Sequence, residues 1–305
     1  MPTVTAADLV AARAEGRAIG SFTTYNLETT LALRDAAENT GLPVIVQLAT
    51  GSFPFVDRAT LLGVVRAAVV GSPSRIGVHL GRSRELDEVA ACLELGCSSV
   101  TIDGSHLPFE ENVEHTRAAV ALGRRAGAWV EGRLGAARDE DGCFDDPGGS
   151  DAPGARYDLD TPDGPAGLRM TDPGRAAEFA ARTGVDALAV QVGAVQTGDV
   201  HGVGGPGCFD LDRLAAIAAA VPVPLVLDAT SGLTDVLLRG AISRGVAKIN
   251  VDAELRRSAF AALGTTLTAA RAADHDLRSL LESARRSVAT TAANRARLFG
   301  LPGAG

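Results

Sequence analysis

The chain has 305 residues, 46% of them hydrophobic, which is enough for one large α/β domain or two small ones. Its 29 basic and 37 acidic residues give a net charge of −8, which argues against a general binder of nucleic acid or anionic membranes. The sequence shows neither an apolar run long enough to span a membrane nor a secretion signal, so we expect a cytoplasmic globular protein. The four cysteines form no paired C-x-x-C motif, which excludes a zinc ribbon.

Short β-branched runs alternate with amphipathic stretches rich in Ala and Leu along the whole chain. The predicted strands cover residues 18–23, 44–48, 76–80, 100–103, 128–133, 187–192, 224–228 and 246–251. The predicted helices cover residues 28–39, 58–70, 84–95, 110–125, 173–183, 211–220 and 234–244, with further helix over 252–299. Most of these strands are continuously apolar, which is typical of a parallel sheet that is covered on both faces.

Eight strands with seven intervening helices predict a single (β/α)8 TIM barrel over residues 1–305, with extra C-terminal helices. A doubly wound open sheet is the alternative, but no G-x-G-x-x-G motif follows the first strand. Residues 136–170, rich in Asp, Gly and Pro, follow the fifth strand and predict either a lid or a disordered insertion. Residues 193–207 hold six glycines, which would let the backbone approach a ligand closely.

Several segments share motifs with one known family. Residues 76–113 read IGVHLGRSRELDEVAACLELGCSSVTIDGSHLPFEENV, and similar pieces are FTTYNLET at 22–29, TDPGRAAEFAARTGVDALAVQV at 171–192, PLVLDATSGL at 224–233 and KINVDAEL at 248–255. Together they resemble the class II ketose-bisphosphate aldolases, the metal-dependent fructose- and tagatose-bisphosphate enzymes. The resemblance implies a barrel, an aldolase-like carbon–carbon lyase that acts on a phosphorylated ketose, and a homo-oligomer, either a dimer or a tetramer.

The positions that the resemblance assigns to zinc binding and proton transfer have changed. The family's third strand ends in His-Leu-Asp-His, whose Asp transfers the proton and whose second His binds zinc. Here those two positions hold Gly81 and Arg82. The second Glu of the family's Glu-x-Glu is Arg133, and the zinc-binding His of His-Gly-Ala-Ser-Gly is Asp228.

The last zinc ligand of the family lies in a Gly-Thr-x-His-Gly motif after the sixth strand. Without a gap Gln196 takes the place of that His, whereas a five-residue insertion places His201 there and improves the spacing to the next helix. A guanidinium about 4 Å from a divalent cation costs on the order of 8 kcal/mol at an effective dielectric of ~20. Arg82 and Arg133 therefore disfavour a metal, and we expect no cofactor. A divalent metal such as zinc would have to use His201 and Asp228.

The resemblance also implies two sets of site residues. The substrate- and phosphate-binding positions are Thr23, Ser52, Gly202, Ala229, Ser231, Lys248, Asn250, Asp252 and Ala253. The catalytic positions are Arg82, Asp103, Arg133, Glu140, His201 and Asp228. Lys248 is the only lysine in the chain, but Schiff-base chemistry is disfavoured because the family's zinc enzymes commonly carry a lysine there without using an imine.

Three hypotheses follow for the function. The first is a divergent, zinc-free lyase in a specialised pathway, in which Arg82 paired with Asp228 replaces the metal and His201 and Glu140 assist. The second is a sugar-phosphate-binding pseudoenzyme, because Gly81 has no acid or base to offer. The third is a metal-dependent aldolase with a rearranged site built on His201, Asp228 and one further carboxylate. All three take a phosphorylated small molecule as ligand and involve no nucleic acid or membrane.

Overall fold

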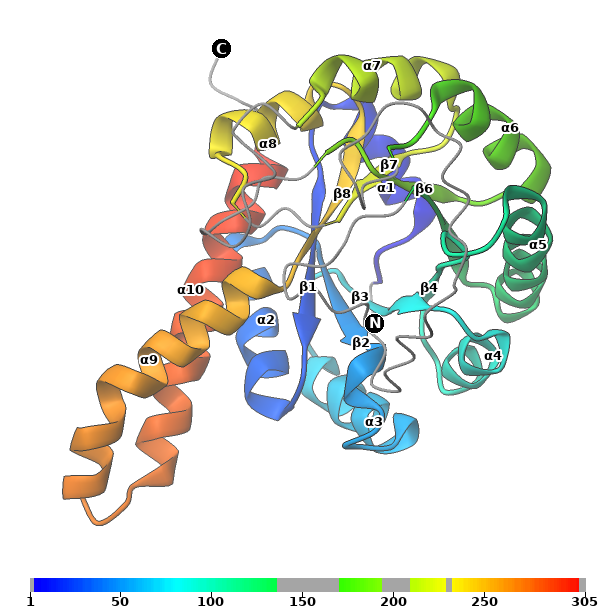
Figure 1. Cartoon of the computed structure of the whole chain (residues 1–305). Coiled ribbons are helices and arrows are strands. Elements are labelled where there is room, and N and C mark those ends of the chain that lie inside the picture. Colours follow the sequence, from blue (N-terminus) through cyan, green and yellow to red (C-terminus); the bar gives the residue numbers. More distant parts are fainter. Residues whose placement is uncertain (1–2, 136–169, 194–208, 229–231, 302–305) are drawn as a thin grey trace, which may run out of the picture.

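A closed barrel of eight parallel strands forms the centre of the molecule in the computed structural model (Figure 1). The structure describes residues 3–135, 170–193, 209–228 and 232–301. The strands are β1 (Ile19–Thr24), β2 (Val44–Ala49), β3 (Ile76–Ser83), β4 (Ser99–Ile102), β5 (Trp129–Leu134), β6 (Ala187–Val190), β7 (Leu225–Leu227) and β8 (Val246–Val251). Each strand pairs with the next along the chain, and β8 pairs with β1. The predicted (β/α)8 barrel is confirmed.

Helices follow the strands and cover the outside of the barrel, as Figure 1 shows. They are α2 (Leu27–Thr40), α3 (Arg58–Val69), α4 (Leu86–Glu94), α5 (Phe109–Ala126), α6 (Pro173–Thr183), α7 (Leu211–Ala220) and α8 (Asp235–Ile242). Local chemistry defines several boundaries: the side chains of Asn26, Asp57 and Asp172 cap helix N-termini. Gly41 and Gly184 end helices in the left-handed conformation. None of the helices in the described ranges is long and apolar enough to cross a membrane.

The sequence-based prediction missed one helix, α1 (Ala6–Ala14), which closes the amino-terminal end of the barrel. Val4 and Leu9 are buried there in one cluster with Ile19, Ile45 and Trp129, which come from the beginnings of β1, β2 and β5. The indole N–H of Trp129 also donates to the Val4 carbonyl at 3.3 Å. The amino end of the barrel is therefore filled with apolar side chains, which leaves the carboxyl end for chemistry.

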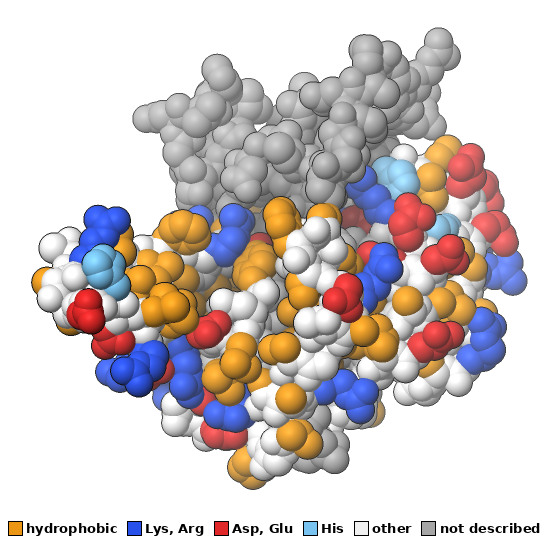
Figure 2. Space-filling model, turned by 90° about the horizontal axis from the view of Figure 1, so that it is seen from below, with side chains coloured by type: hydrophobic (Ala, Val, Ile, Leu, Met, Phe, Trp, Pro, Cys, Tyr) orange, Lys and Arg blue, Asp and Glu red, His pale blue; other side chains and the backbone are white. Residues whose placement is uncertain are grey.

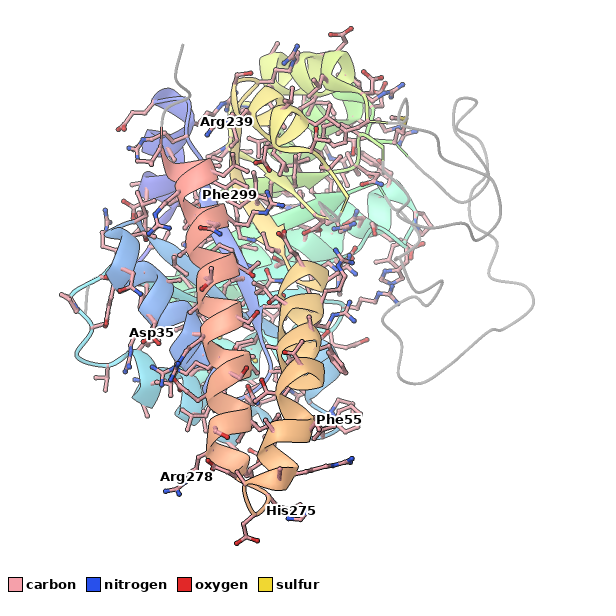
Figure 3. The ribbon with its side chains drawn as sticks, turned by 90° about the vertical axis from the view of Figure 1, so that its left-hand side faces the viewer. Asp35, Phe55, Arg239, His275, Arg278 and Phe299 are labelled. Atoms are coloured by element: carbon pink, nitrogen blue, oxygen red, sulfur yellow. The ribbon has the colours of Figure 1, made fainter. Side chains whose placement is uncertain are left out.

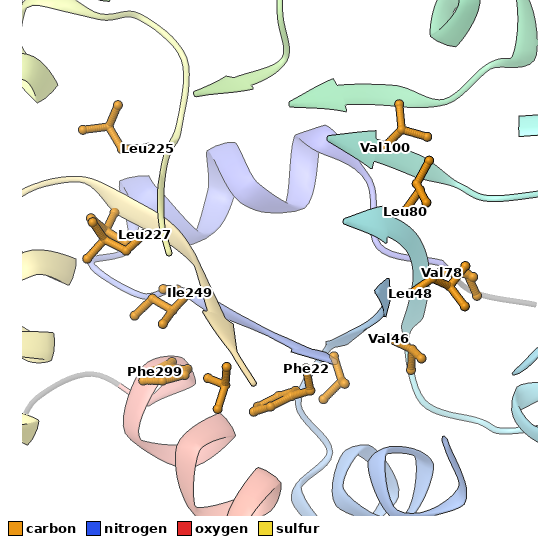
Figure 4. Packing of buried hydrophobic residues seen from close by; sticks show 14 of the residues in the cluster. Phe22, Val46, Leu48, Val78, Leu80, Val100, Leu225, Leu227, Ile249 and Phe299 are labelled. Atoms are coloured by element: carbon orange, nitrogen blue, oxygen red, sulfur yellow. The ribbon is translucent and has the colours of Figure 1, made fainter. Parts of the chain in front are cut away.

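Side chains along each strand alternate between the two faces of the barrel wall. One set points outward into the main hydrophobic core beneath the helices and includes Phe22, Val46, Leu80 and Ile249 (Figure 4). The other set points into the barrel, where it is apolar at the amino end and polar further along. This alternation places the polar candidate residues of different strands in a common interior.

The last two helices, α9 (Ala253–Ala272) and α10 (Leu277–Gly300), form a hairpin that extends beyond the barrel (Figures 1 and 3). His275 lies in the turn at its tip, whereas Phe299 is buried at the other end. Arg285 of α10 forms an ion pair of 2.6 Å with Asp35 of α2. The extra C-terminal helices expected from the sequence are thus present, and α10 is attached to the barrel through Arg285 and the buried Phe299. Acidic and basic side chains are interspersed over the face in Figure 2, without a field of one sign.

Replacing Phe179 by alanine tests the outer core. Phe179 is fully buried and packs against the backbone of Gly132 and the ring of Phe109. We expect Phe179→Ala to lower the free energy of unfolding by about 3–5 kcal/mol in a urea titration, because the truncation leaves a cavity. The matched control is Phe55→Ala, because Phe55 is 90% exposed. This substitution should change the free energy of unfolding by less than about 0.5 kcal/mol. Equal effects of the two substitutions would contradict this packing.

Candidate active site

Four polar side chains meet where β4, β5, β7 and β8 reach their carboxyl ends. The guanidinium of Arg133 lies between two carboxylates: its Nε is 3.5 Å from Oδ2 of Asp103, and its Nη1 pairs with Oδ2 of Asp228. The amide Nδ2 of Asn250 donates to the other oxygen of Asp228. The side chains of Arg133, Asp103 and Asp228 are only 6–9% exposed, so these charges are almost fully removed from water.

A second set of buried polar groups lies directly beneath this one. Lys248 has no exposed surface, and its Nζ lies 2.9 Å from Oε2 of Glu131 and 2.7 Å from Oδ1 of Asn250. The hydroxyl of Thr101 donates to the second oxygen of Glu131 at 3.0 Å. Since the Asn250 oxygen accepts from Lys248, its amide nitrogen is directed at Asp228. The two layers are therefore one continuous hydrogen-bonded network.

The charges of this network shift the pKa values of its members. Burial raises the pKa of Asp103, but Arg133, a hydrogen bond from Ser105 and the nearby Arg82 together lower it below its ordinary value. Burial lowers the pKa of Lys248, and the adjacent Glu131 opposes that shift. Asp103 is thus held as a carboxylate, which suits it to orient an arginine and makes it a poor proton acceptor.

His79 lies deeper in the barrel, and its ring is fully engaged. Its Nδ1 and Nε2 each lie 2.8 Å from a hydroxyl, those of Ser99 and Thr101, and its ring stacks on Trp129 with centroids 5.3 Å apart. Burial, assisted by the charge of Lys248, lowers its pKa well below the ordinary value. His79 is therefore a neutral structural element of the network.

The space above Gly81 is filled by a residue that the sequence-based prediction missed. A Cβ added at Gly81 would lie 2.8 Å from Cγ and Cδ of Gln47. The Oε1 of Gln47 accepts a hydrogen bond of 3.1 Å from Ser21, and its Nε2 lies 3.5 Å from the hydroxyl of Thr23. The sequence feature that could have indicated Gln47 is its place as the single polar residue in the strand VIVQLA. An amide thus lies beside the position where the resembling family carries its proton-transferring carboxylate.

Arg82 lies at an irregularity between β3 and β4. The strand register shifts between Leu80 and Ser83, and Arg82 has φ = 36°, a left-handed conformation that side chains other than glycine rarely adopt. Its charge contributes to the lowered pKa of Asp103, so its guanidinium is close to the network. In the structure Asp228 pairs with Arg133. The pairing of Arg82 with Asp228 stays a prediction.

The remaining predicted positions lie around the same end of the barrel or outside the described residues. Ser52 is buried in the short helix Thr50–Ser52 after β2. Asp252 and Ala253 mark the N-terminus of α9 directly after β8, and the hydroxyl of Tyr25 donates to Asp252 at 2.5 Å. Outside the described residues lie Glu140, Gln196, His201, Gly202, Ala229 and Ser231, together with residues 136–169 of the predicted lid or insertion at 136–170.

Residues 4–304 match the family described as fructose-bisphosphate aldolase class-II. The chain belongs to this aldolase family. It is 35% identical to a fructose-bisphosphate aldolase of Thermus caldophilus over 96% of both chains. It is 34% identical to the D-tagatose-1,6-bisphosphate aldolase subunit GatY of Klebsiella oxytoca, covering 81% of this chain and 80% of that one.

Among solved structures, the YdjI aldolase of Escherichia coli K12 superposes with a TM-score of 0.79, at 26% identity and 98% coverage of both chains. The family resemblance stated from the motifs and the predicted class of aldolase-like carbon–carbon lyase are confirmed. The barrel fold is shared with the solved relative as well.

The described part of the site does not fit the zinc ion that membership of the aldolase family implies. Within residues 3–135, 170–193, 209–228 and 232–301, no three His, Cys, Asp or Glu side chains come together as a metal site would require. The two carboxylates at the carboxyl end of the barrel, Asp103 and Asp228, have the guanidinium of Arg133 between them. A cation already balances the carboxylates that a divalent ion would need.

Substitution of Gly81 tests whether Gln47 fills the space beside it. We expect Gly81→Ala to lower the free energy of unfolding by about 1–3 kcal/mol, because its Cβ would lie too close to Gln47. In a Gln47→Ala background the same substitution should cost much less. The control Gly51→Ala, which has no atom within 4 Å of its Cβ, should have little effect. An equal cost of Gly81→Ala in both backgrounds would disprove the contact.

The buried His79 predicts a pH dependence of stability. Its folded-state pKa lies well below 6.5, so below that pH the unfolded chain takes up a proton that the folded chain does not. Stability should therefore fall as the pH drops below 6.5, with this group contributing up to about 1.4 kcal/mol per pH unit. Urea titrations between pH 5 and 7 should show a shallower slope for His79→Gln. His275→Gln, at the exposed hairpin turn, is the control that should keep the wild-type slope.

Proposed function

We propose that this aldolase-family protein is a zinc-free lyase that acts on a phosphorylated ketose or a dihydroxyacetone phosphate unit. The observation that carries the proposal is the buried guanidinium of Arg133, held between Asp103 and Asp228 at the carboxyl end of the barrel. Relatives named as fructose- and tagatose-bisphosphate aldolases support a sugar bisphosphate as the substrate class. The changed site supports a specialised pathway in place of unmodified fructose-bisphosphate cleavage.

Cleavage of a ketose between C3 and C4 moves the bonding electrons toward the C2 carbonyl. The C4 hydroxyl loses its proton and becomes the carbonyl of the released aldehyde, and the C2 oxygen acquires the negative charge of an enediolate. A fixed cation next to that oxygen lowers the barrier. Arg133 has the required charge and burial, and Arg82 adds to the positive potential around Asp103.

The proton transfers fall to other groups. Arginines hold Asp103 as a carboxylate, and Asp228 is engaged by both Arg133 and Asn250. We therefore assign the proton transfers to Glu140 and His201. In the aldolase resemblance these residues correspond to a loop carboxylate and to a zinc-binding histidine, and both lie outside the described residues. Reprotonation of the enediolate at C3 then completes the release of dihydroxyacetone phosphate.

The substrate phosphate is assigned to the N-terminus of α9. This helix begins at Ala253, directly after the carboxyl end of β8, so its first backbone N–H groups lie at the same end of the barrel as Arg133. Ser231, Gly202 and Ala229 complete this subsite in the proposal, together with Thr23 on β1, the neighbour of β8, and Ser52 in the short helix after β2. We further propose a cytoplasmic dimer or tetramer, as the family resemblance implies.

Exchange of substrate protons with heavy water tests the proposed chemistry. In heavy water, wild-type protein stripped of metal should catalyse the exchange of a hydroxymethyl proton of dihydroxyacetone phosphate for deuterium. The exchange is measured by proton NMR. Arg133→Met should slow the exchange by about 10²–10³-fold, because the charge beside the developing oxyanion is lost. We expect Arg82→Ala to abolish turnover while the protein stays folded. The control is Arg278→Met, on a side chain that is 99% exposed.

Two results would replace the proposal with its alternatives. Stoichiometric metal in the purified protein, required for exchange, would indicate a metal-dependent aldolase that uses His201 and Asp228. Stabilisation by dihydroxyacetone phosphate without any proton exchange would indicate a sugar-phosphate-binding protein that lacks catalysis.

A further inference from the structure

Gln191 is a buried polar residue at the carboxyl end of the barrel to which the aldolase resemblance assigns no role. The residue is 3% exposed. Before it, Leu188 and Val190 point outward into the main core, whereas Ala187 and Ala189 point into the barrel, and Val192 after it points outward again. The alternation therefore directs Gln191 into the barrel.

The strand register places Gln191 beside the catalytic charges. Val190 pairs with Leu227 of β7, so the next residue along each strand brings Gln191 next to Asp228. Arg133 on β5 pairs with Ala189, which is one interior position below Gln191. Gln191 therefore lies next to the ion pair of Arg133 and Asp228, at the carboxyl end of the barrel where the proposed substrate binds.

The backbone of Gln191 is firmly held. Its N–H donates to the hydroxyl of Thr171 at 2.9 Å, and its carbonyl accepts from the Thr171 N–H at 2.7 Å. The Thr171 hydroxyl in turn donates to the carbonyl of Leu134 at 2.6 Å. The position of this side chain is thus determined by its neighbours on both sides.

The amide nitrogen of Gln191 nevertheless has no hydrogen-bond partner among the described residues, although it is buried. The side chains of Lys248, Glu131 and His79 in the barrel interior are bonded. Oδ2 of Asp228 accepts no hydrogen bond either, but it is ion-paired with Arg133. A buried amide N–H that lacks an acceptor is unfavourable and is uncommon in folded proteins. An acceptor supplied by a ligand would remove that penalty.

We propose that the amide nitrogen of Gln191 donates a hydrogen bond to the C2 oxygen of the bound hydroxyketone phosphate, beside Arg133; this rests on the proposed function. Because the amide is neutral, it adds a hydrogen-bond donor without competing as a cation with Arg133 for Asp228. The same hydrogen bond strengthens as the carbonyl oxygen becomes an enediolate oxygen. Gln191 is thus a further substrate-binding residue of this site.

A pair of ligands and one substitution test this assignment. Gln191→Met keeps the length of the side chain and removes its donor. The ligands are dihydroxyacetone phosphate and propane-1,3-diol monophosphate, which lacks the C2 oxygen, and their dissociation constants are measured by calorimetry on metal-stripped full-length protein. Thermal unfolding without ligand provides a readout that does not depend on binding.

We expect Gln191→Met to raise the dissociation constant of dihydroxyacetone phosphate about tenfold. The affinity for propane-1,3-diol monophosphate should stay unchanged. The ligand-free variant should melt at the same temperature as wild type or higher, because an unpaired buried amide has been removed. A lower melting temperature would show that the amide has a partner within the protein and would overturn the inference. So would an unchanged affinity for dihydroxyacetone phosphate, or an equal loss for both ligands.

The two proposals fail in different ways in this experiment. If wild-type protein binds dihydroxyacetone phosphate and the variant binds it equally well, the role of Gln191 is wrong and the proposed function stands. If wild-type protein binds neither ligand, the proposed function is wrong, and the substrate contact of Gln191 is wrong with it.

Discussion

The ion pairing of Arg133 with Asp103 and Asp228 is the constraint on which the interior of this barrel depends. Three charges are buried at the ends of three strands, and a buried charge is tolerated only when it is paired and hydrogen bonded. Removal of the guanidinium would leave two buried carboxylates without the cation that they share. The strand register that closes the barrel and the charges that meet at its carboxyl end therefore support each other.

The constraint continues inward through Asn250. Its amide oxygen accepts from Lys248 and its nitrogen donates to Asp228, so an amide links a buried cation to a buried anion. Lys248 in turn needs Glu131, whose second oxygen is taken by Thr101. Each polar group thus fixes the orientation of the next. Connected hydrogen bonds of this kind hold the side chains of a site in one arrangement.

The barrel could be predicted from the sequence because its strands are continuously apolar and its helices begin and end with strong capping residues. The strand Val246–Val251 and the helix Pro173–Thr183 match the predicted ranges to the residue. The pairing within the site could not be predicted, since two arginines compete for one carboxylate. Regular strand geometry directs Arg133 inward above Glu131, whereas Arg82 follows a register shift. Gln47 and Gln191 were missed because only packing shows which space a strand amide fills.

In the proposed zinc-free mechanism a guanidinium is an imperfect replacement for zinc, and neutral donors would therefore matter in the site. A metal ion carries two charges and binds oxygen directly, whereas Arg133 carries one charge and shares it with two carboxylates. In the proposed mechanism its effect on an enediolate would be correspondingly smaller. Additional hydrogen-bond donors aimed at the same oxygen compensate in part, and in a buried site they act at low dielectric. In the proposal the amide of Gln191 supplies such a donor without adding a cation that would compete with Arg133 for Asp228.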